Sequence, residues 1–544
     1  MSRGRLISLL LFIASAAFVV WRSSEVAVLV DFAYVVNIAT RIAAGDVPYR
    51  DFPLAQAPLE FVLQAVLIKI FGPHYVVQIA YAAVMGGIAT VLTFVITRRL
   101  LAPLSWADAL GALLSLALVP LGVYAILPHP FYDSDACVLV LAGIALVLAA
   151  RDRPTALRWI AAGAVLTVPL LMKQNIGGAF LALMVGALGV EALVRADQRR
   201  AFGTLAIGVA AGLAVEVVAL QLIVGLDQFI QWTWTYALAG RGVTLQRLRE
   251  FVDPPILLPG ALLLMVTAAA QRLAPSGRAV AFAVGLGLFV VWLALAPTLL
   301  AAAPFYFPPI LIAASVLALA RAAREGVRFE TLVPLVVTGT TLGTLQSQGL
   351  RDSSFGIFPL LVIGTASLVR DLAFFVDRPW RIAPLTGVAL AVLLTVTGLV
   401  YTIGNVRLQF VDVGSGPIAR STFPSLAGLS ARGPYVADLD ALLFWARDNI
   451  PASDAVVFLP GEDPTFFALG WRPRLPSVYF YDVASPYSPE EIARFADQVD
   501  LRWVVVKDRL QLREEPPLEK ALVALLTDRA TLAATIGPYR VFKR

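Results

Sequence analysis

Four polar stretches interrupt an otherwise apolar chain, and they carry the residue types that could do chemistry. Ionisable side chains are costly at membrane depth, so they are usually retained for a binding site or a pathway. A carboxylate can accept a proton from a hydroxyl, and a fixed cation can stabilise a developing negative charge. The stretches are Asp31–Glu60, Pro128–Asp135, Lys173–Asn175 and Gln346–Ser354.

Asp31 and Lys173 are the first candidates, one a carboxylate and the other a cation. Asp31 stands between the first apolar run and a short amphipathic one, where it is a candidate functional carboxylate. The alternative is that Asp31 is a solvated loop acid or a helix cap. Lys173 ends an apolar run, where it either binds a substrate or only extends its ammonium group to the lipid headgroups. In the second stretch, Asp133 or Asp135 could be the N-cap of the next helix. One histidine with scattered carboxylates is weak support for a metal site.

The elements that must position these residues are transmembrane helices. Of 544 residues, 59% are apolar and 15% are charged, and the mean hydropathy is +0.79. No soluble domain could cover that much apolar side chain. We therefore expect a polytopic α-helical membrane protein with about 13 transmembrane helices, each near the roughly 20 residues that cross a bilayer. The expected spans are Leu6–Trp21, Tyr75–Thr97, Ala107–Leu127, Ala136–Ala150, Trp159–Leu171, Ile176–Val194, Ala201–Val224, Pro255–Ala270, Ala279–Leu299, Phe305–Ala320, Thr331–Leu345, Phe355–Val369 and Ile382–Ile403.

The basic residues orient these spans, because short cytoplasmic loops retain Lys and Arg. Arginines occur in every second loop from Arg3 to Arg381. We expect a cytoplasmic N-terminus, and an extracytoplasmic location for everything after Ile403, in a cytoplasmic (inner) membrane. The cytoplasmic arginines explain the net charge of +6, so no nucleic-acid partner is expected. Four cations are expected on the outer side, against the bias of Lys and Arg toward the cytoplasm. A binding site for an anionic headgroup would require such charges. The four residues are Arg50, Lys173, Arg241 and Arg351.

Two parts of the chain are expected outside the membrane. Residues 1–403 form the membrane domain, whose first outer loop, 22–74, carries interfacial helices at Tyr34–Ala44 and Pro58–Phe71 that are too short to span. Residues 404–544 form a small α/β domain, because helical and strand patterns alternate there. Its expected helices are Val436–Asn449, a helix to Val499 that starts with a capping box at Ser488 and Glu491, and Leu518–Thr527. Its expected strands are Ala455–Leu459, Ser477–Tyr481, Trp503–Lys507 and Tyr539–Lys543. The aromatic residues Trp232, Trp234 and Tyr236 are most simply a belt at the membrane interface.

The motifs in the polar stretches resemble those of the GT-C superfamily of membrane glycosyltransferases, near the protein O-mannosyltransferases and the lipid A aminoarabinose transferase. The motifs are Asp31 followed by Tyr34 and Gly45-Asp-Val-Pro-Tyr-Arg-Asp-Phe52, a proline-led short helix at Pro58, the Phe131-Tyr-Asp133 loop and Lys173-Gln174. As architecture, the likeness covers most of the chain. It implies a polyprenyl-phosphate-sugar donor, used at the outer membrane face, and a glycan, lipid or protein acceptor in the cell envelope.

The resemblance also implies residue roles. Asp31 would be the catalytic carboxylate that takes or orients the acceptor hydroxyl's proton, and Asp133 would shape the site or hold a divalent ion. Cations would meet the charge on the departing polyprenyl phosphate. The expected substrate-binding residues are Tyr34, Tyr49, Arg50, Asp51, Gln56, Lys173, Gln174 and Arg351.

Two positions depart from the family pattern. Related transferases often have Glu where Gln56 stands, and an adjacent acidic pair where Asp31 is followed by Phe32. Glu60, one turn after Gln56, is a substitute for the missing acid. Metal dependence therefore stays open, with a divalent cation as the candidate cofactor.

Two other functions compete with sugar transfer. A transporter or lipid flippase would also retain intramembrane charges, but such proteins tend to show repeated halves and helices broken at the midplane, whereas here the polar groups cluster at one face. A non-catalytic assembly factor would use its outer domain to bind partners.

Overall fold

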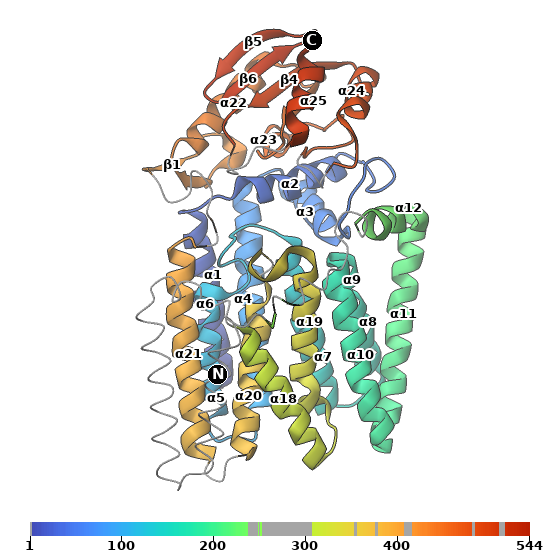
Figure 1. Cartoon of the computed structure of the whole chain (residues 1–544), viewed down its shortest axis with the longest axis vertical. Coiled ribbons are helices and arrows are strands. Elements are labelled where there is room, and N and C mark those ends of the chain that lie inside the picture. Colours follow the sequence, from blue (N-terminus) through green and yellow to red (C-terminus); the bar gives the residue numbers. More distant parts are fainter. Residues whose placement is uncertain are drawn as a thin grey trace.

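The computed structural model describes residues 3–237, 249, 251–252, 307–352, 356–375, 379–406, 408, 416–480, 485–510 and 517–544. Upright helices lie side by side and form a bundle, and the strands form a separate layer at one end of it (Figure 1). We call residues 416–544, as far as they are described, the C-terminal domain. The bundle end that faces this domain is the outer end, and the opposite end is the inner end.

Seven described helices contain stretches long and apolar enough to cross a membrane, so the chain is a multi-pass membrane protein. They are α1 (Arg3–Ser23), α4 (Tyr75–Leu100), α7 (Tyr132–Asp152), α10 (Gln174–Val194), α11 (Arg199–Ile223, preceded by the 3-10 turn η1, Ala196–Gln198), α20 (Phe358–Phe375) and α21 (Pro379–Ile403). Two further expected spans coincide with α18 (Phe307–Glu325) and α19 (Phe329–Asp352). The expected spans Pro255–Ala270 and Ala279–Leu299 lie outside the described residues, so the total of about 13 stays a prediction.

Prolines interrupt two of the expected spans. The run Ala107–Leu127 forms only α5 (Ala107–Leu116) and α6 (Leu118–Leu121) before the chain becomes irregular. The run Trp159–Leu171 divides into α8 (Ala156–Thr167) and α9 (Pro169–Met172). Pro120 and Pro169 lack the N–H group that would continue the helical hydrogen bonds, so the expectation of continuous helices was wrong. Lys173 follows α9 and links it to α10.

Two other boundaries differ from expectation at the polar stretches. Both Asp133 and Asp135 lie in the first turn of α7, whose N-cap is Phe131, so neither carboxylate is the cap residue. Helix α19 continues through most of the expected loop Gln346–Ser354 and ends at Asp352. Helical hydrogen bonds therefore continue past the polar residues that suggested a loop.

Charged side chains join the helices at the inner end. The pairs are Arg98–Asp108 at 2.6 Å, Arg99–Asp152, Arg151–Glu191 at 2.8 Å, Arg151–Glu330 at 3.0 Å and Arg321–Asp371 at 3.0 Å. They connect α4, α5, α7, α10, α18, α19 and α20. The arginines that define the predicted topology thus meet at one end, and the polar stretches occupy the other.

Two short helices cross the outer end between the upright helices and the C-terminal domain (Figure 1). They are α2 (Leu29–Ala43) and α3 (Leu59–Phe71), which overlap the two expected short helices; α2 begins before the expected Tyr34 and includes Asp31. The apolar face of α2 packs against the C-terminal domain, where Phe32 and Phe467 are in edge contact at 5.7 Å. Burial of these aromatic faces fixes α2 below the domain.

The C-terminal domain contains a four-stranded sheet in the order β3-β4-β6-β5. Strands β3 and β4 are parallel, whereas β6 is antiparallel to both β4 and β5. The strands are β3 (Ala455–Leu459), β4 (Leu501–Lys507), β5 (Thr531–Ile536) and β6 (Tyr539–Lys543), with a separate pair β1 (Ile418–Arg420) and β2 (Ser430–Arg432). The helices are α22 (Tyr435–Asn449), α23 (Thr465–Leu469), α24 (Pro489–Gln498) and α25 (Pro517–Thr527), with the 3-10 turn η5 (Pro424–Leu426). The expected α/β composition and the capping box of Ser488 and Glu491 are confirmed.

The expected strand Ser477–Tyr481 is wrong as far as it is described. Residues 477–480 are irregular, and Tyr481 lies outside the described residues. The Phe480 N–H donates to the carbonyl oxygen of Pro460, beyond the end of β3, and the preceding Pro476 has no N–H to give. The segment therefore crosses the sheet edge toward α2 instead of joining the ladder.

Candidate functional site

The outer end of the bundle contains a buried ion pair. Lys173 is 5% exposed, and its Nζ lies 3.3 Å from Oδ1 of Asp133. The same ammonium group lies 4.1 Å from the ring centre of Tyr132, where the aromatic face adds a cation–π attraction. The break between α9 and α10 and the first turn of α7 bring these groups together. The site thus holds a fixed cation paired with a buried carboxylate.

The next residue, Gln174, connects this pair to the first outer loop. Its Oε1 accepts from the Ala57 N–H at 3.2 Å, and its Nε2 donates to the carbonyl oxygens of Ala55 and Thr233, each at 3.0 Å. One side chain therefore holds the loop before α3 and the segment after α12 (Leu226–Ile230) against the top of α10.

Asp31 and Tyr34 face the same region from α2. Tyr34 donates to Gln56 Oε1 at 2.5 Å, and Tyr49 donates to the Gln56 carbonyl oxygen at 2.7 Å. Asp31 lies in the first turn of α2, three residues before Tyr34 and on the same face of the helix. Gln56 therefore connects the first outer loop to α2 by accepting hydrogen bonds from both tyrosines.

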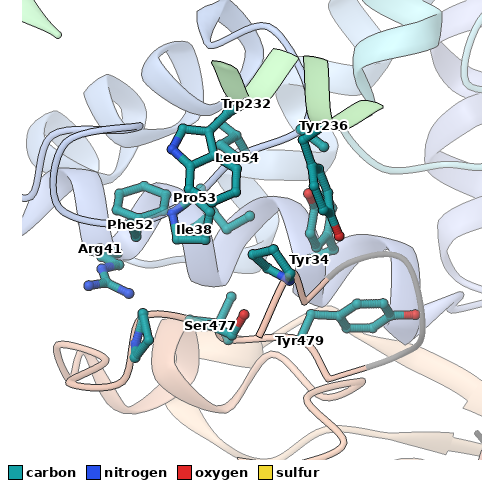
Figure 2. Close-up of a pocket in the computed structure, with 14 residues that line it drawn as sticks. Tyr34, Ile38, Arg41, Phe52, Pro53, Leu54, Trp232, Tyr236, Ser477 and Tyr479 are labelled. Atoms are coloured by element: carbon teal, nitrogen blue, oxygen red, sulfur yellow. The ribbon is translucent and has the colours of Figure 1, made fainter. Parts of the chain in front are cut away.

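A cleft opens between α2, the first outer loop and the C-terminal domain (Figure 2). Tyr34 and Tyr479 form part of its wall, with their ring centres 5.5 Å apart. Burial raises the pKa of Tyr479 well above its usual value, and the negative charge of Asp31 raises it further. The charge of Asp31 therefore acts on the Tyr479 hydroxyl, although Asp31 does not itself line the cleft. The lining residues are Tyr34, Ile38, Arg41, Phe52, Pro53, Leu54, Ala55, Trp232, Tyr236, Pro476, Ser477, Val478, Tyr479 and Pro486.

The remaining predicted residues are not all brought to this region. Arg50 pairs with its neighbour Asp51 at 2.9 Å, and its side chain is 59% exposed. Arg351 lies in the last turn of α19, but its side chain is outside the described part of the structure, and Arg241 is outside it altogether. Lys173 is thus the predicted cation that the described structure places in a buried site.

Glu60 and Asp135 are neighbouring carboxylates that the sequence did not predict to be a pair. Asp135 accepts from the hydroxyl of the buried Tyr124 at 2.6 Å and from that of the partly buried Tyr81, and Asp135 itself is fully buried. Burial raises the pKa of the Glu60 carboxyl well above its usual value, and the nearby Asp135 charge raises it further. Glu60 was singled out in the sequence because it is a polar residue at the start of an apolar helix. Its proximity to Asp135 had no signal in the sequence, because Asp135 lies in another helix.

The C-terminal domain contains a further buried charge cluster that the sequence did not indicate. Lys507, at the end of β4, lies 2.7 Å from Glu462 and 2.8 Å from Asp463, which follow β3. Tyr539 donates to Asp463 at 2.9 Å, and Tyr435 contacts both acids. Parallel strands bring their carboxyl ends to one edge, which explains the meeting of residues from β3 and β4.

This cluster is attached directly to α2. The Asn37 side chain donates to the Asp463 carbonyl oxygen at 2.9 Å and accepts from the Phe467 N–H at 3.1 Å. The C-terminal domain is therefore fixed to the helix that carries Asp31 and Tyr34.

A metal ion is a separate question. Within the described ranges, no group of three or more His, Cys, Asp or Glu side chains is placed to hold one. We derive no step through a metal ion.

No family model and no curated protein matches the sequence. Solved structures align with most of it. ArnT from Cupriavidus metallidurans in the apo state is 12% identical, with a TM-score of 0.46 over 98% of this chain and 97% of that chain. The same protein bound to undecaprenyl phosphate is 13% identical, with a TM-score of 0.42 over 98% and 97%.

The archaeal oligosaccharyltransferase AglB from Archaeoglobus fulgidus, in complex with an inhibitory peptide and a dolichol-phosphate, is 12% identical, with a TM-score of 0.49 over 92% of this chain and 69% of that chain. ArnT and AglB are GT-C glycosyltransferases, the class that the sequence motifs resemble. We base the function on the contacts of this chain's own residues.

Proposed function

We propose that the protein is a membrane glycosyltransferase, which moves a sugar from a polyprenyl-phosphate-linked donor to a cell-envelope acceptor at the outer face of the cytoplasmic membrane. The observation that carries the proposal is the junction at Lys173 and Gln174. Lys173 supplies a buried cation, and Gln174 holds the loop whose Gln56 binds Tyr34, one turn from Asp31. A cation for a lipid phosphate and a carboxylate for an acceptor thus share the outer end of the bundle.

The donor phosphate binds beside Lys173. Asp133 neutralises the ammonium group when no donor is present, because an unpaired charge would be very costly at this depth. A phosphodiester that arrives at this group shares its N–H donors, and charge-assisted hydrogen bonds of this kind are strong. When the phosphate leaves, it gains a second negative charge, which Lys173 stabilises more than it stabilises the bound donor.

The acceptor hydroxyl approaches from the side of α2. Asp31 accepts the hydroxyl proton while the acceptor oxygen forms a bond to the anomeric carbon of the sugar. The bond between that carbon and the phosphate oxygen breaks, and the phosphate keeps its electron pair. Tyr34, Tyr49 and Gln174 hold the intervening loop in place.

Reconstitution tests the proposal. The full chain is placed in phospholipid vesicles with labelled polyprenyl-phosphate sugars and an envelope lipid fraction, and transfer of label is measured. We expect Asp31→Asn to lower kcat by about a hundredfold or more, the usual contribution of a positioned base. Asp227→Asn, which changes a carboxylate in the first turn of α12, is the matched control and should keep full turnover. Normal turnover by the Asp31 variant would remove this residue from the mechanism, and carrier flux without transfer would favour a flippase.

A further inference from the structure

Trp232 and Tyr236 line the cleft and are not simply part of an interfacial belt. Both lie in η2 (Gln231–Tyr236), a π-helical turn, and their rings are in edge contact at 5.7 Å. Such turns are rare and frequently occur at functional sites. Trp234, from the same turn, is 42% exposed and does not line the cleft. The turn thus separates three aromatic residues that the sequence had grouped together.

The cleft combines aromatic faces with hydroxyl groups. The rings of Trp232 and Tyr236 lie on the opposite side of the cleft from Ser477 and Tyr479 (Figure 2). Tyr34 contributes a further ring and hydroxyl. A pyranose ring presents C–H groups on its faces and hydroxyl groups on its edge, so its polarity matches both kinds of wall.

The cation that lines the described part of the cleft is already bound. Arg41 forms an ion pair with Asp46 at 2.5 Å, and Asp46 also pairs with Arg472. The other donors of Arg41 bind the carbonyl oxygen of Leu475 at 2.5 Å and that of Asp51 at 3.3 Å. Because these donors of Arg41 are already engaged, the cleft favours an uncharged ligand that binds through its hydroxyl groups and ring faces.

We propose that this cleft binds a neutral saccharide ring of the acceptor, stacked against Trp232 and Tyr236. The inference rests on the proposed function, since it names the substrate class of that site. The cleft wall includes Tyr34, which follows Asp31 by one turn of α2, and Ala55, whose carbonyl is bound by the residue after Lys173. A sugar bound there lies beside the elements that carry the carboxylate and the cation.

The experiment uses the full chain in phosphatidylcholine nanodiscs without sugar-based detergent. The probes are methyl glucoside and methyl N-acetylglucosaminide, and their binding is measured by saturation-transfer NMR. We expect saturable binding, with contacts to the C–H faces of the ring. Trp232→Leu keeps apolar volume but removes the ring, and it should weaken binding about tenfold. Trp234→Leu is the matched control and should bind as the unaltered protein does.

Three results would overturn the inference. They are no saturable binding of either glycoside, equal loss in the two tryptophan variants, and stronger competition at this cleft by glucose 6-phosphate than by methyl glucoside. Farnesyl phosphate binding, compared between the unaltered protein and the double variant Lys173→Met/Asp133→Leu, tests the donor side separately. If that phosphate binds through Lys173 and no sugar binds at Trp232, only the further inference fails. If the sugar binds and farnesyl phosphate does not, the proposed function fails.

Discussion

Lys173 and Asp133 face each other at the outer end of the helical bundle, with Nζ 3.3 Å from Oδ1 and both side chains almost fully enclosed. Removal of one partner from a buried ion pair strands the other charge, which typically costs about 3–5 kcal/mol. Replacement of both partners by apolar residues avoids that cost. The pair therefore allows its structural role to be separated from its proposed role in catalysis.

We expect Lys173→Met to lower thermal stability strongly, because Asp133 loses its partner. The double variant Lys173→Met/Asp133→Leu should recover most of that stability and yet transfer no sugar, since the cation for the phosphate is gone. Thermal unfolding and sugar transfer are measured on the same preparations. Transfer by the double variant would show that the pair is only structural.

Gln174→Leu should loosen the first outer loop. The substitution removes three hydrogen bonds to Ala57, Ala55 and Thr233, and an unsatisfied buried group costs about 1–3 kcal/mol. We expect faster hydrogen exchange in residues 55–57 and a lower rate of transfer. Asn175→Leu, which breaks a bond to the Gly343 carbonyl instead, is the neighbouring control and should leave exchange in that loop unchanged.

Asn37→Leu should weaken the attachment of the C-terminal domain. It leaves the buried Asp463 carbonyl and Phe467 N–H without their partner from α2. We expect increased exchange across residues 463–469. Thr40→Val removes only a bond within α2, to the Val36 carbonyl, and serves as the control. Unaltered exchange in the Asn37 variant would mean that apolar contacts alone hold the domain.

The Lys507 cluster should make stability depend on pH through Asp463. Burial and the neighbouring Glu462 charge raise the pKa of Asp463 well above its ordinary 3.8, against a smaller lowering by the Tyr539 hydroxyl. The folded state therefore holds this proton more tightly than the unfolded state. Its stabilising contribution is complete below about pH 4 and decreases as the pH rises through the folded pKa.

Asp463→Asn removes this dependence. Over the range from pH 4 to pH 8, we expect the stability of the variant to decrease less than that of the unaltered protein, as followed by thermal unfolding. The other charged group that faces Asp463 from β4 is Lys507, which stays in place in both proteins. Parallel curves would show that Asp463 is ionised in the folded state throughout this range.

The sequence by itself determined the elements whose signal is local. Apolar runs near membrane thickness predicted the spans α1, α4, α7, α10 and α11, and a Ser488–Glu491 spacing predicted the start of α24. The strand Ala455–Leu459 was also predicted, because β-branched and apolar residues cluster there. Asp31 and Lys173 were selected by the cost of charged groups at this depth, and Tyr34 by the family resemblance.

Only the tertiary structure decided which of these groups meet. Gln174 and Ala57 are distant in sequence, as are Asp135 and Tyr81, and no spacing rule relates them. The same holds for Lys507 and Glu462, which parallel strand pairing brings to one edge, and for Trp232, which a π-helical turn directs into the cleft. Local propensity acts over one or two helical turns, whereas these contacts arise from the packing of whole elements. For that reason the sequence indicated the outer end as the candidate site, and the fold selected the partners within it.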